Sequence, residues 1–237
     1  MRSLAVLCLA AFLVAPVLAD WDPGDGHKMH FPQLPDPNGW DVNATLPKVL
    51  ADDWLCTESG PVTDIHFWGS FEEDYWYPID MFILSIHDND PGPPSKPVNP
   101  PLWEWLFMAG EWTERHYGSG DQGWYDPNTG LWNRPDHFEF YQYNFVDIPD
   151  PFYQEEGVIY WLDVSAVILD QYHRWGWKTS QDHWMDAAVW ADVDTGLDWR
   201  PLYDPETQEQ LDMAFVITPE PASLCLLGLG LVLLRRR

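Results

Sequence analysis

The strongest constraint on the fold is a series of short apolar runs, each rich in β-branched and aromatic residues and separated by turns rich in proline and glycine. Such runs are typical of strands, and a spacing of about ten residues is typical of antiparallel sheets. The runs lie at 62–71, 79–87, 138–146, 158–168, 175–178, 187–191 and 211–217. The sequence predicts an all-β protein with few helices, built as an antiparallel β-sandwich, jelly-roll-like, with long proline-rich loops such as 88–101.

The chain is acidic and aromatic at the same time. Its 237 residues carry a formal net charge of −26 and include 16 Trp, 11 Phe and 10 Tyr. So many aromatic side chains exclude a disordered acidic segment, which buries too little apolar surface to fold. The negative charge disfavours nucleic acid as a partner and suits divalent cations or neutral polymers. Cys56 is the only cysteine outside the two ends of the chain, so we expect no internal disulfide.

The first nineteen residues have the pattern of a secretory signal peptide. Arg2 provides a positive start, an apolar run occupies 4–17, and Ala19 stands just before the expected cleavage site. We expect signal peptidase to cut after Ala19. Residues 20–48 are rich in Pro, Gly and Asp, which predicts an irregular N-terminal arm, and 49–217 are expected to form the sandwich domain.

The C-terminal end combines three features in a fixed order. They are the tripeptide Pro219, Glu220 and Pro221, an apolar run at 222–234, and the terminal cluster Arg235, Arg236 and Arg237. As a helix the apolar run would measure about 20 Å, which is short of a bilayer core of about 30 Å. The combination resembles the PEP-CTERM sorting signal, whose tail an exosortase, an integral-membrane protease, recognises and cuts.

This resemblance implies where the protein goes. A short hydrophobic transmembrane helix within 218–237 would hold the chain in the inner membrane before processing, with the preceding domain outside. Delivery to the cell surface or to an extracellular polysaccharide matrix would follow. The tail resembles a processing signal more than a permanent anchor because its apolar run is short.

A second resemblance covers the middle of the chain. The segments VLADDWLC (49–56), VTDIHFWGS (62–70) and IYWLDV (159–164) are the longest that carry it. Shorter ones lie at 82–87, 123–127, 141–145 and 176–180. Together they are similar to an uncharacterised domain that recurs in exported bacterial proteins with PEP-CTERM tails. The resemblance implies a single domain over roughly 40–217, and it implies no catalytic residues.

One acidic turn is a candidate metal site. Asp192, Asp194 and Asp198 alternate around Gly196, and carboxylates so spaced can wrap Ca²⁺, which takes six to eight oxygen ligands. The spacing departs from an EF-hand loop, which requires a further ligand before the glycine and a distal glutamate. A solvated acidic turn is the alternative interpretation.

Sixteen tryptophans exceed what one sandwich core requires, so we expect some of them at the surface. Indole faces stack on the apolar faces of sugars, while neighbouring polar groups bind the hydroxyls. Five tryptophans near expected loops are the candidates for such a platform: Trp103, Trp105, Trp124, Trp132 and Trp177. Packing inside the core is the alternative for each.

These features favour an exported, non-catalytic protein of the envelope or matrix that binds exopolysaccharide through exposed aromatic side chains. A polysaccharide hydrolase with two acidic catalytic residues is the first alternative, although the many acids in the chain single out no pair. A purely structural matrix protein is the second. The sequence identifies no cofactor other than a candidate Ca²⁺.

Overall fold

The structure is a computed structural model that describes residues 20–218. Within that range the protein is all-β: it has no α-helix, and one 3₁₀ turn, η1 (Glu72–Asp74), follows a strand. The predicted all-β class is therefore confirmed, and the jelly-roll connectivity stays a prediction. Residues 20–218 contain no helix with the length and apolar character that crossing a membrane requires. The signal peptide (1–19) and the sorting tail with its hydrophobic helix (219–237) lie outside the described residues.

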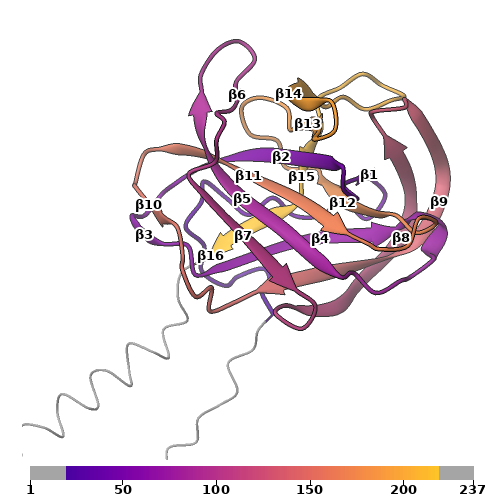
Figure 1. The fold of residues 1–237 in the computed structure, drawn as a ribbon, viewed down its shortest axis with the longest axis horizontal. Helices are drawn as coiled ribbons and strands as arrows, with labels where there is room; N and C mark the ends of the chain where they lie inside the picture. Colours follow the sequence, from indigo (N-terminus) through magenta and orange to yellow (C-terminus); the bar gives the residue numbers. More distant parts are fainter. Residues whose placement is uncertain (1–19, 219–237) are drawn as a thin grey trace, which may run out of the picture. The chain divides into compact units, whose positions relative to one another are not determined.

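Two large sheets make up the domain (Figure 1). The first has the order β15 (Asp212–Met213), β12 (Trp175–Ser180), β1 (Trp40–Asn43), β8 (Thr113–Asp126), β9 (Leu131–Phe145), β4 (Asp64–Phe71) and β16 (Phe215–Thr218). The second has the order β14 (Gly196–Pro201), β13 (Val189–Asp192), β2 (Lys48–Leu55), β11 (Ile159–Val167), β5 (Met81–Asp90) and β6 (Lys96–Pro97), and β7 (Trp103–Met108) also pairs with β5. A small third sheet joins β3 (Gly60–Pro61) to β10 (Tyr153–Gln154).

The first sheet closes on itself. β4 pairs with β9, β9 with β8, β8 with β1 and β1 with β12, and β12 then returns to pair with β4. These five strands form a closed arrangement that we call the five-strand ring. All of its pairs are antiparallel except β1 and β8, which run parallel. Figure 1 shows the β8–β9 hairpin, the longest in the domain, curving away at the right.

An aromatic core fills the space between the five-strand ring and the second sheet. Phe67 of β4 lies with its ring centroid 5.4 Å from that of Phe82 on β5, and Phe82 lies 5.0 Å from Trp175 on β12. All three side chains are fully buried. Because strand side chains alternate between faces, the residues on either side of Phe67 point into the five-strand ring instead.

The interior of the five-strand ring is polar. Lys178 of β12 donates a hydrogen bond to Asp41 of β1 over 3.0 Å and another to Gln122 of β8. At the end of the ring near the N-terminal segment, the backbone carbonyl of Trp21 accepts 2.7 Å hydrogen bonds from Arg115 and Gln142. A buried polar group is costly unless it is hydrogen-bonded, and these contacts satisfy Lys178, Gln122 and Gln142. One carboxylate oxygen of Asp41 has no partner among residues 20–218.

Most of the predicted runs appear as strands, and three differences have a physical reason. Residues 20–48 were expected to be irregular, yet β1 lies within them and closes the five-strand ring. β8 was not expected, because its inward face is polar and its sequence rich in glycine. Within 88–101, expected to be a loop, β5 continues to Asp90 and β6 pairs with it.

Candidate functional site

A cavity of about 330 Å³ opens at one end of the five-strand ring. Every strand of the ring contributes to it: Asn43 ends β1, Trp124 and Asp126 end β8, and Trp132 begins β9. Glu72 follows the end of β4 and Arg174 precedes the start of β12, and both also line the cavity. Ligand sites are typically concave, mainly apolar and equipped with a few polar groups. We call this cavity the mouth pocket.

Two of the predicted platform tryptophans meet in the mouth pocket. Trp124 is only 5% exposed and presents part of its indole to the cavity, while Trp132 is 45% exposed. The Trp132 ring meets Trp40 edge to face, with centroids 5.8 Å apart, which holds it in place. Gly176 makes room for Trp124, because a Cβ at Gly176 would lie 2.7 Å from an atom of that indole.

Polar groups surround the two indoles. The amide of Asn43 donates a 3.4 Å hydrogen bond to Asp126, whose other carboxylate oxygen accepts the backbone N–H of Asn128. Burial, together with the negative charge of a neighbouring aspartate, raises the pKa of Glu72, while Arg174 partly offsets the shift. The pocket thus offers carboxylate, amide and guanidinium groups beside an exposed aromatic face.

Buried charges lie beneath Trp124. His137 hydrogen-bonds Asp41 through Nε2 and Asp136 through Nδ1, each over 2.9 Å. Burial opposes a charge on His137, but these two aspartates raise its pKa to about 9, so the imidazole carries a proton at neutral pH. Lys178 is held by the same carboxylate of Asp41. This network fixes the strands that shape the pocket, and we assign it a structural role.

The other platform candidates lie elsewhere. Trp177 is fully buried in the main core, so neither face of its indole is open to a ligand. Trp103 and Trp105 lie on β7 of the second sheet, half-buried against the core. The structure therefore brings together Trp124 and Trp132 but not the five candidates, and these five form no continuous exposed row.

The candidate Ca²⁺ residues occupy the β13–β14 turn. One oxygen of Asp192 pairs with Lys48 over 3.0 Å and the other accepts the backbone N–H of Asp194. Asp198 lies 3.5 Å from Arg200. In the described part of the chain, no three His, Cys, Asp or Glu side chains are grouped so that they could hold a metal ion. The Asp192 carboxylate is thus engaged by Lys48 and by backbone, and the Asp198 carboxylate lies near Arg200.

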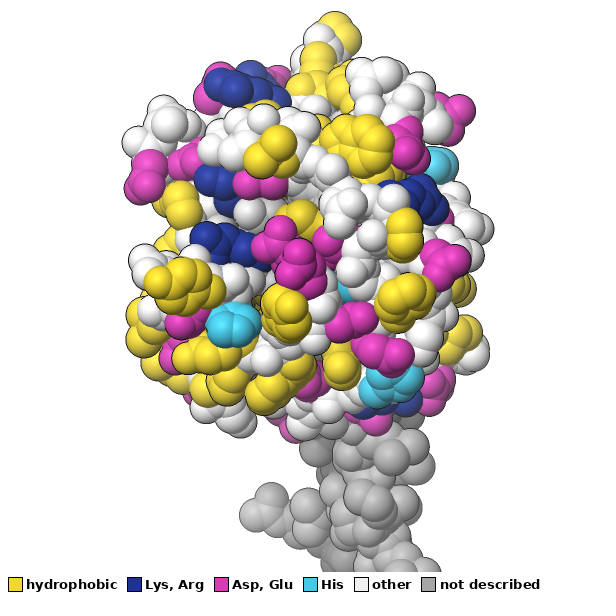
Figure 2. Space-filling view, turned by 90° about the vertical axis from the view of Figure 1, so that its right-hand side faces the viewer, with side chains coloured by type: hydrophobic (Ala, Val, Ile, Leu, Met, Phe, Trp, Pro, Cys, Tyr) yellow, Lys and Arg dark blue, Asp and Glu magenta, His cyan; other side chains and the backbone are white. Residues whose placement is uncertain are grey.

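Several groups that line the mouth pocket carry little signal in the sequence. Glu72 and Arg174 lie about a hundred positions apart in the chain and meet only because β4 and β12 pair. Leu131 and Trp132 are exposed at the start of β9. The β8–β9 hairpin lies at the right of Figure 1, and Figure 2 views the domain from that side. On this side, hydrophobic side chains lie between acidic ones. A mixed aromatic and acidic surface of this kind is open to uncharged hydroxylated ligands.

A second set of buried carboxyls lies where β2 meets β15. Asp52 accepts a 2.8 Å hydrogen bond from the side chain of Gln33. Asp53 is 1% exposed, and neither of its carboxyl oxygens has a hydrogen-bond partner among residues 20–218. Burial, followed by the charges of Asp212 and Asp186, raises the pKa of Asp53 to about 8. Asp53 is therefore a neutral carboxylic acid at pH 7.

Comparison with known proteins identifies two segments. Residues 218–237 match the PEP-CTERM protein-sorting motif, which indicates an exported protein and implies processing by the membrane protease exosortase. No curated protein and no solved structure matches the chain. Residues 29–218 match the model of a family described as a domain of unknown function, DUF7901. Since that match covers most of the chain, from the N-terminal segment to the last strand, the protein belongs to the DUF7901 family.

Proposed function

We propose that this exported protein binds carbohydrate in the mouth pocket and acts at the cell surface or in the extracellular matrix without catalysing a reaction. The observation that carries the proposal is the exposed indole of Trp132 beside Trp124 in a cavity of about 330 Å³. Pockets for small ligands begin at about this size. Exopolysaccharide is the proposed natural partner.

The chemistry of the pocket suits a sugar. The apolar C–H face of a pyranose stacks on an indole, and Trp132 presents its indole at the rim. The hydroxyls of the sugar both donate and accept hydrogen bonds, and Asn133, Asp126 and Arg174 offer both kinds of partner. A long anionic polymer would be repelled by a chain of net charge −26, so neutral glycans are the expected ligands of this pocket.

A glycan array followed by calorimetry tests the proposal. Purified residues 20–218 are applied at low and high calcium, and affinities are then measured for Trp132→Ala and for Tyr153→Ala as the matched control. Tyr153 is an exposed aromatic residue of β10 that does not line the pocket. We expect Trp132→Ala to weaken binding about tenfold, as the loss of one stacked aromatic contact of about 1.5 kcal/mol implies, and the control to bind normally.

If Trp132→Ala left glycan binding unchanged, the mouth pocket would not be the binding site. If no glycan bound at either calcium level, the carbohydrate-binding function would be refuted, and a purely structural role in the matrix would take its place. A calcium requirement for binding would support the predicted Ca²⁺ site at Asp192, Asp194 and Asp198.

Glycoside hydrolysis is a second candidate because two carboxyls, Glu72 and Asp126, line the mouth pocket together. The raised pKa of Glu72 is the property that a general acid needs. A reducing-end assay on any glycan that binds distinguishes the two functions. Release of reducing ends by the wild type and its loss in Glu72→Gln would establish a hydrolase, whereas binding without release supports the non-catalytic function.

A further inference from the structure

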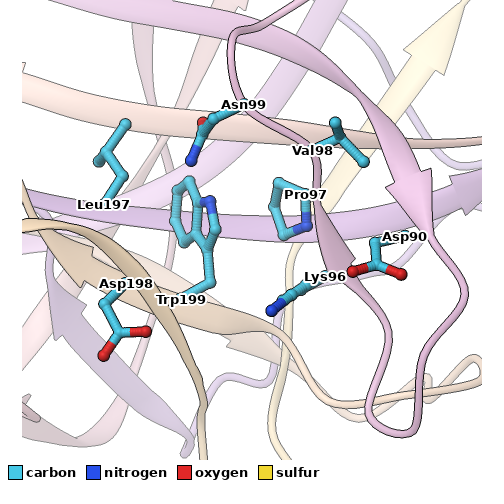
Figure 3. Close-up of a pocket in the computed structure, with 8 residues that line it drawn as sticks. All are labelled: Asp90, Lys96, Pro97, Val98, Asn99, Leu197, Asp198 and Trp199. Atoms are coloured by element: carbon cyan, nitrogen blue, oxygen red, sulfur yellow. The ribbon is translucent and has the colours of Figure 1, made fainter.

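A separate pocket lies between β6 and β14 of the second sheet (Figure 3). Its volume is about 260 Å³. Lys96, Pro97 and Asn99 form one wall, on and beside β6, and the β14 strand supplies the other through Leu197 and Trp199. We call it the β6–β14 pocket.

The indole N–H of Trp199 has no acceptor in the described domain. Trp199 is only 8% exposed, so its N–H is largely shielded from bulk solvent. Figure 3 shows the nitrogen edge of this indole turned toward Pro97, between the residues that line the pocket. A buried donor without an acceptor costs about 1–3 kcal/mol, and a ligand oxygen in the pocket would remove that cost.

The wall opposite Trp199 is held firmly in place. The carbonyl of Val98 bonds Nδ1 of His87 over 2.9 Å, and Nε2 of His87 bonds Asp163 over 2.7 Å. Ser85 donates to the same carboxylate over 2.6 Å. The His87 ring also meets Trp199 edge to face, with centroids 6.0 Å apart. The pocket is therefore largely preformed, which lowers the entropic cost of binding.

Two further donors of the pocket, on Lys96 and Asn99, have no partner among the described residues. Lys96 forms no ion pair with any described residue, and the Asn99 amide makes no hydrogen bond within the same part of the chain. The two carboxylates of the pocket are partly engaged, since Asp198 lies 3.5 Å from Arg200 and Asp90 accepts the backbone N–H of Gly92. An ammonium, an indole N–H and an amide together recognise a carboxylate.

We propose that the β6–β14 pocket binds the carboxylate of a single sugar acid, such as a uronic acid residue at a chain end. The Trp199 N–H, the Lys96 ammonium and the Asn99 amide bind the carboxylate oxygens. Pro97 and Leu197 pack against the C–H groups of the sugar ring, and Asp90 accepts from its hydroxyls. This site is independent of the mouth pocket, and the two are tested separately.

The test follows the indole N–H signals of protein labelled with ¹⁵N-tryptophan while glucuronate, glucose or glucosamine is added. Trp199→Phe keeps a flat aromatic side chain, lacks the N–H and identifies the Trp199 signal by its absence. We expect glucuronate to shift that signal, and Lys96→Met to weaken the affinity about tenfold or more. For Trp199→Phe, which has no such signal, calorimetry should show a loss of affinity of the same size. Trp132→Ala, which alters only the mouth pocket, is expected to bind glucuronate as the wild type does.

Three results would overturn the proposal. They are the absence of any shift with glucuronate at millimolar concentration, an equal response to glucose, and a stronger response to glucosamine. Lys96 is exposed, so Lys96→Met tests the charge without disturbing the core even if Trp199→Phe were to destabilise the domain. Failure of glycan binding in the mouth pocket with a retained glucuronate response would refute the proposed function and leave this site standing.

Discussion

Replacing Asp53 with asparagine is expected to remove the part of a loss of stability between pH 4 and pH 7 that ionisation of Asp53 causes. Asp53 is buried on β2, its carboxyl has no hydrogen-bond partner among the described residues, and the negative charges of Asp212 and Asp186 raise its pKa further. Ionisation at this position places a bare negative charge inside the protein. Asparagine has nearly the same shape as the neutral acid and cannot ionise.

The magnitude follows from the difference between two pKa values. The pKa of Asp53 is about 8 in the folded protein and 3.8 for an ordinary aspartate. The folded state therefore holds the proton more tightly, so stability is full below pH 4 and falls as the pH rises toward 8. At about 1.4 kcal/mol per pKa unit, the wild type should lose about 4 kcal/mol between pH 4 and pH 7 through this residue alone.

Urea unfolding of both proteins at five pH values from 4 to 8 measures the effect. The difference in free energy of unfolding between Asp53→Asn and the wild type should grow with pH and favour the variant at pH 7. Asp121→Asn, at an exposed aspartate of β8, is the control and should stay within about 0.5 kcal/mol of the wild type. Parallel curves for Asp53→Asn and the wild type would refute the assignment of a neutral buried acid.

Two other substitutions address the five-strand ring. His137→Gln should be most destabilising at low pH. The pKa of His137 is raised from 6.5 to about 9, which corresponds to a contribution of about 3 kcal/mol to the free energy of unfolding. This contribution is complete below pH 6.5 and is lost as the pH rises through 9. A pH-independent difference in urea unfolding would contradict this. Gly176→Ala should cost about 1–3 kcal/mol and weaken glycan binding, because its Cβ would lie 2.7 Å from Trp124 and displace it. If Gly176→Ala left both the free energy of unfolding and the calorimetric affinity for glycan unchanged, Trp124 would not need the space beside Gly176.

The strands that the sequence predicts best are those whose core-facing side chains are all apolar. The runs at 79–87 and 158–168 correspond to β5 and β11, where Leu84, Ile86 and Leu162 are fully buried. β8 gives a weaker signal because Gln122 and Arg115 point into a polar interior rather than an apolar one. A strand whose inward side chains are polar does not show the usual alternation of apolar and polar residues.

The sequence predicts the candidate site only where a single residue, such as a tryptophan near a turn, indicates it. Trp124 and Trp132 were selected as aromatic side chains near turns, and both line the mouth pocket. Trp177 has the same local character, yet it is buried because Lys178, its neighbour, takes the inward position in the five-strand ring. Which of two adjacent residues faces the core depends on pairing with β1, and no local pattern reveals that pairing.

Closure of the five-strand ring also has a consequence for how the domain folds. Asp41 and Lys178, which close it, are separated by 137 positions in the chain. Pairings over such distances form slowly, because the entropy of a long loop must be lost before any contact compensates for it. A chain that stops before Trp175 has β1 and β4 without the strand between them, and Asp41 without its lysine. A fragment that ends before Trp175 therefore cannot close the five-strand ring.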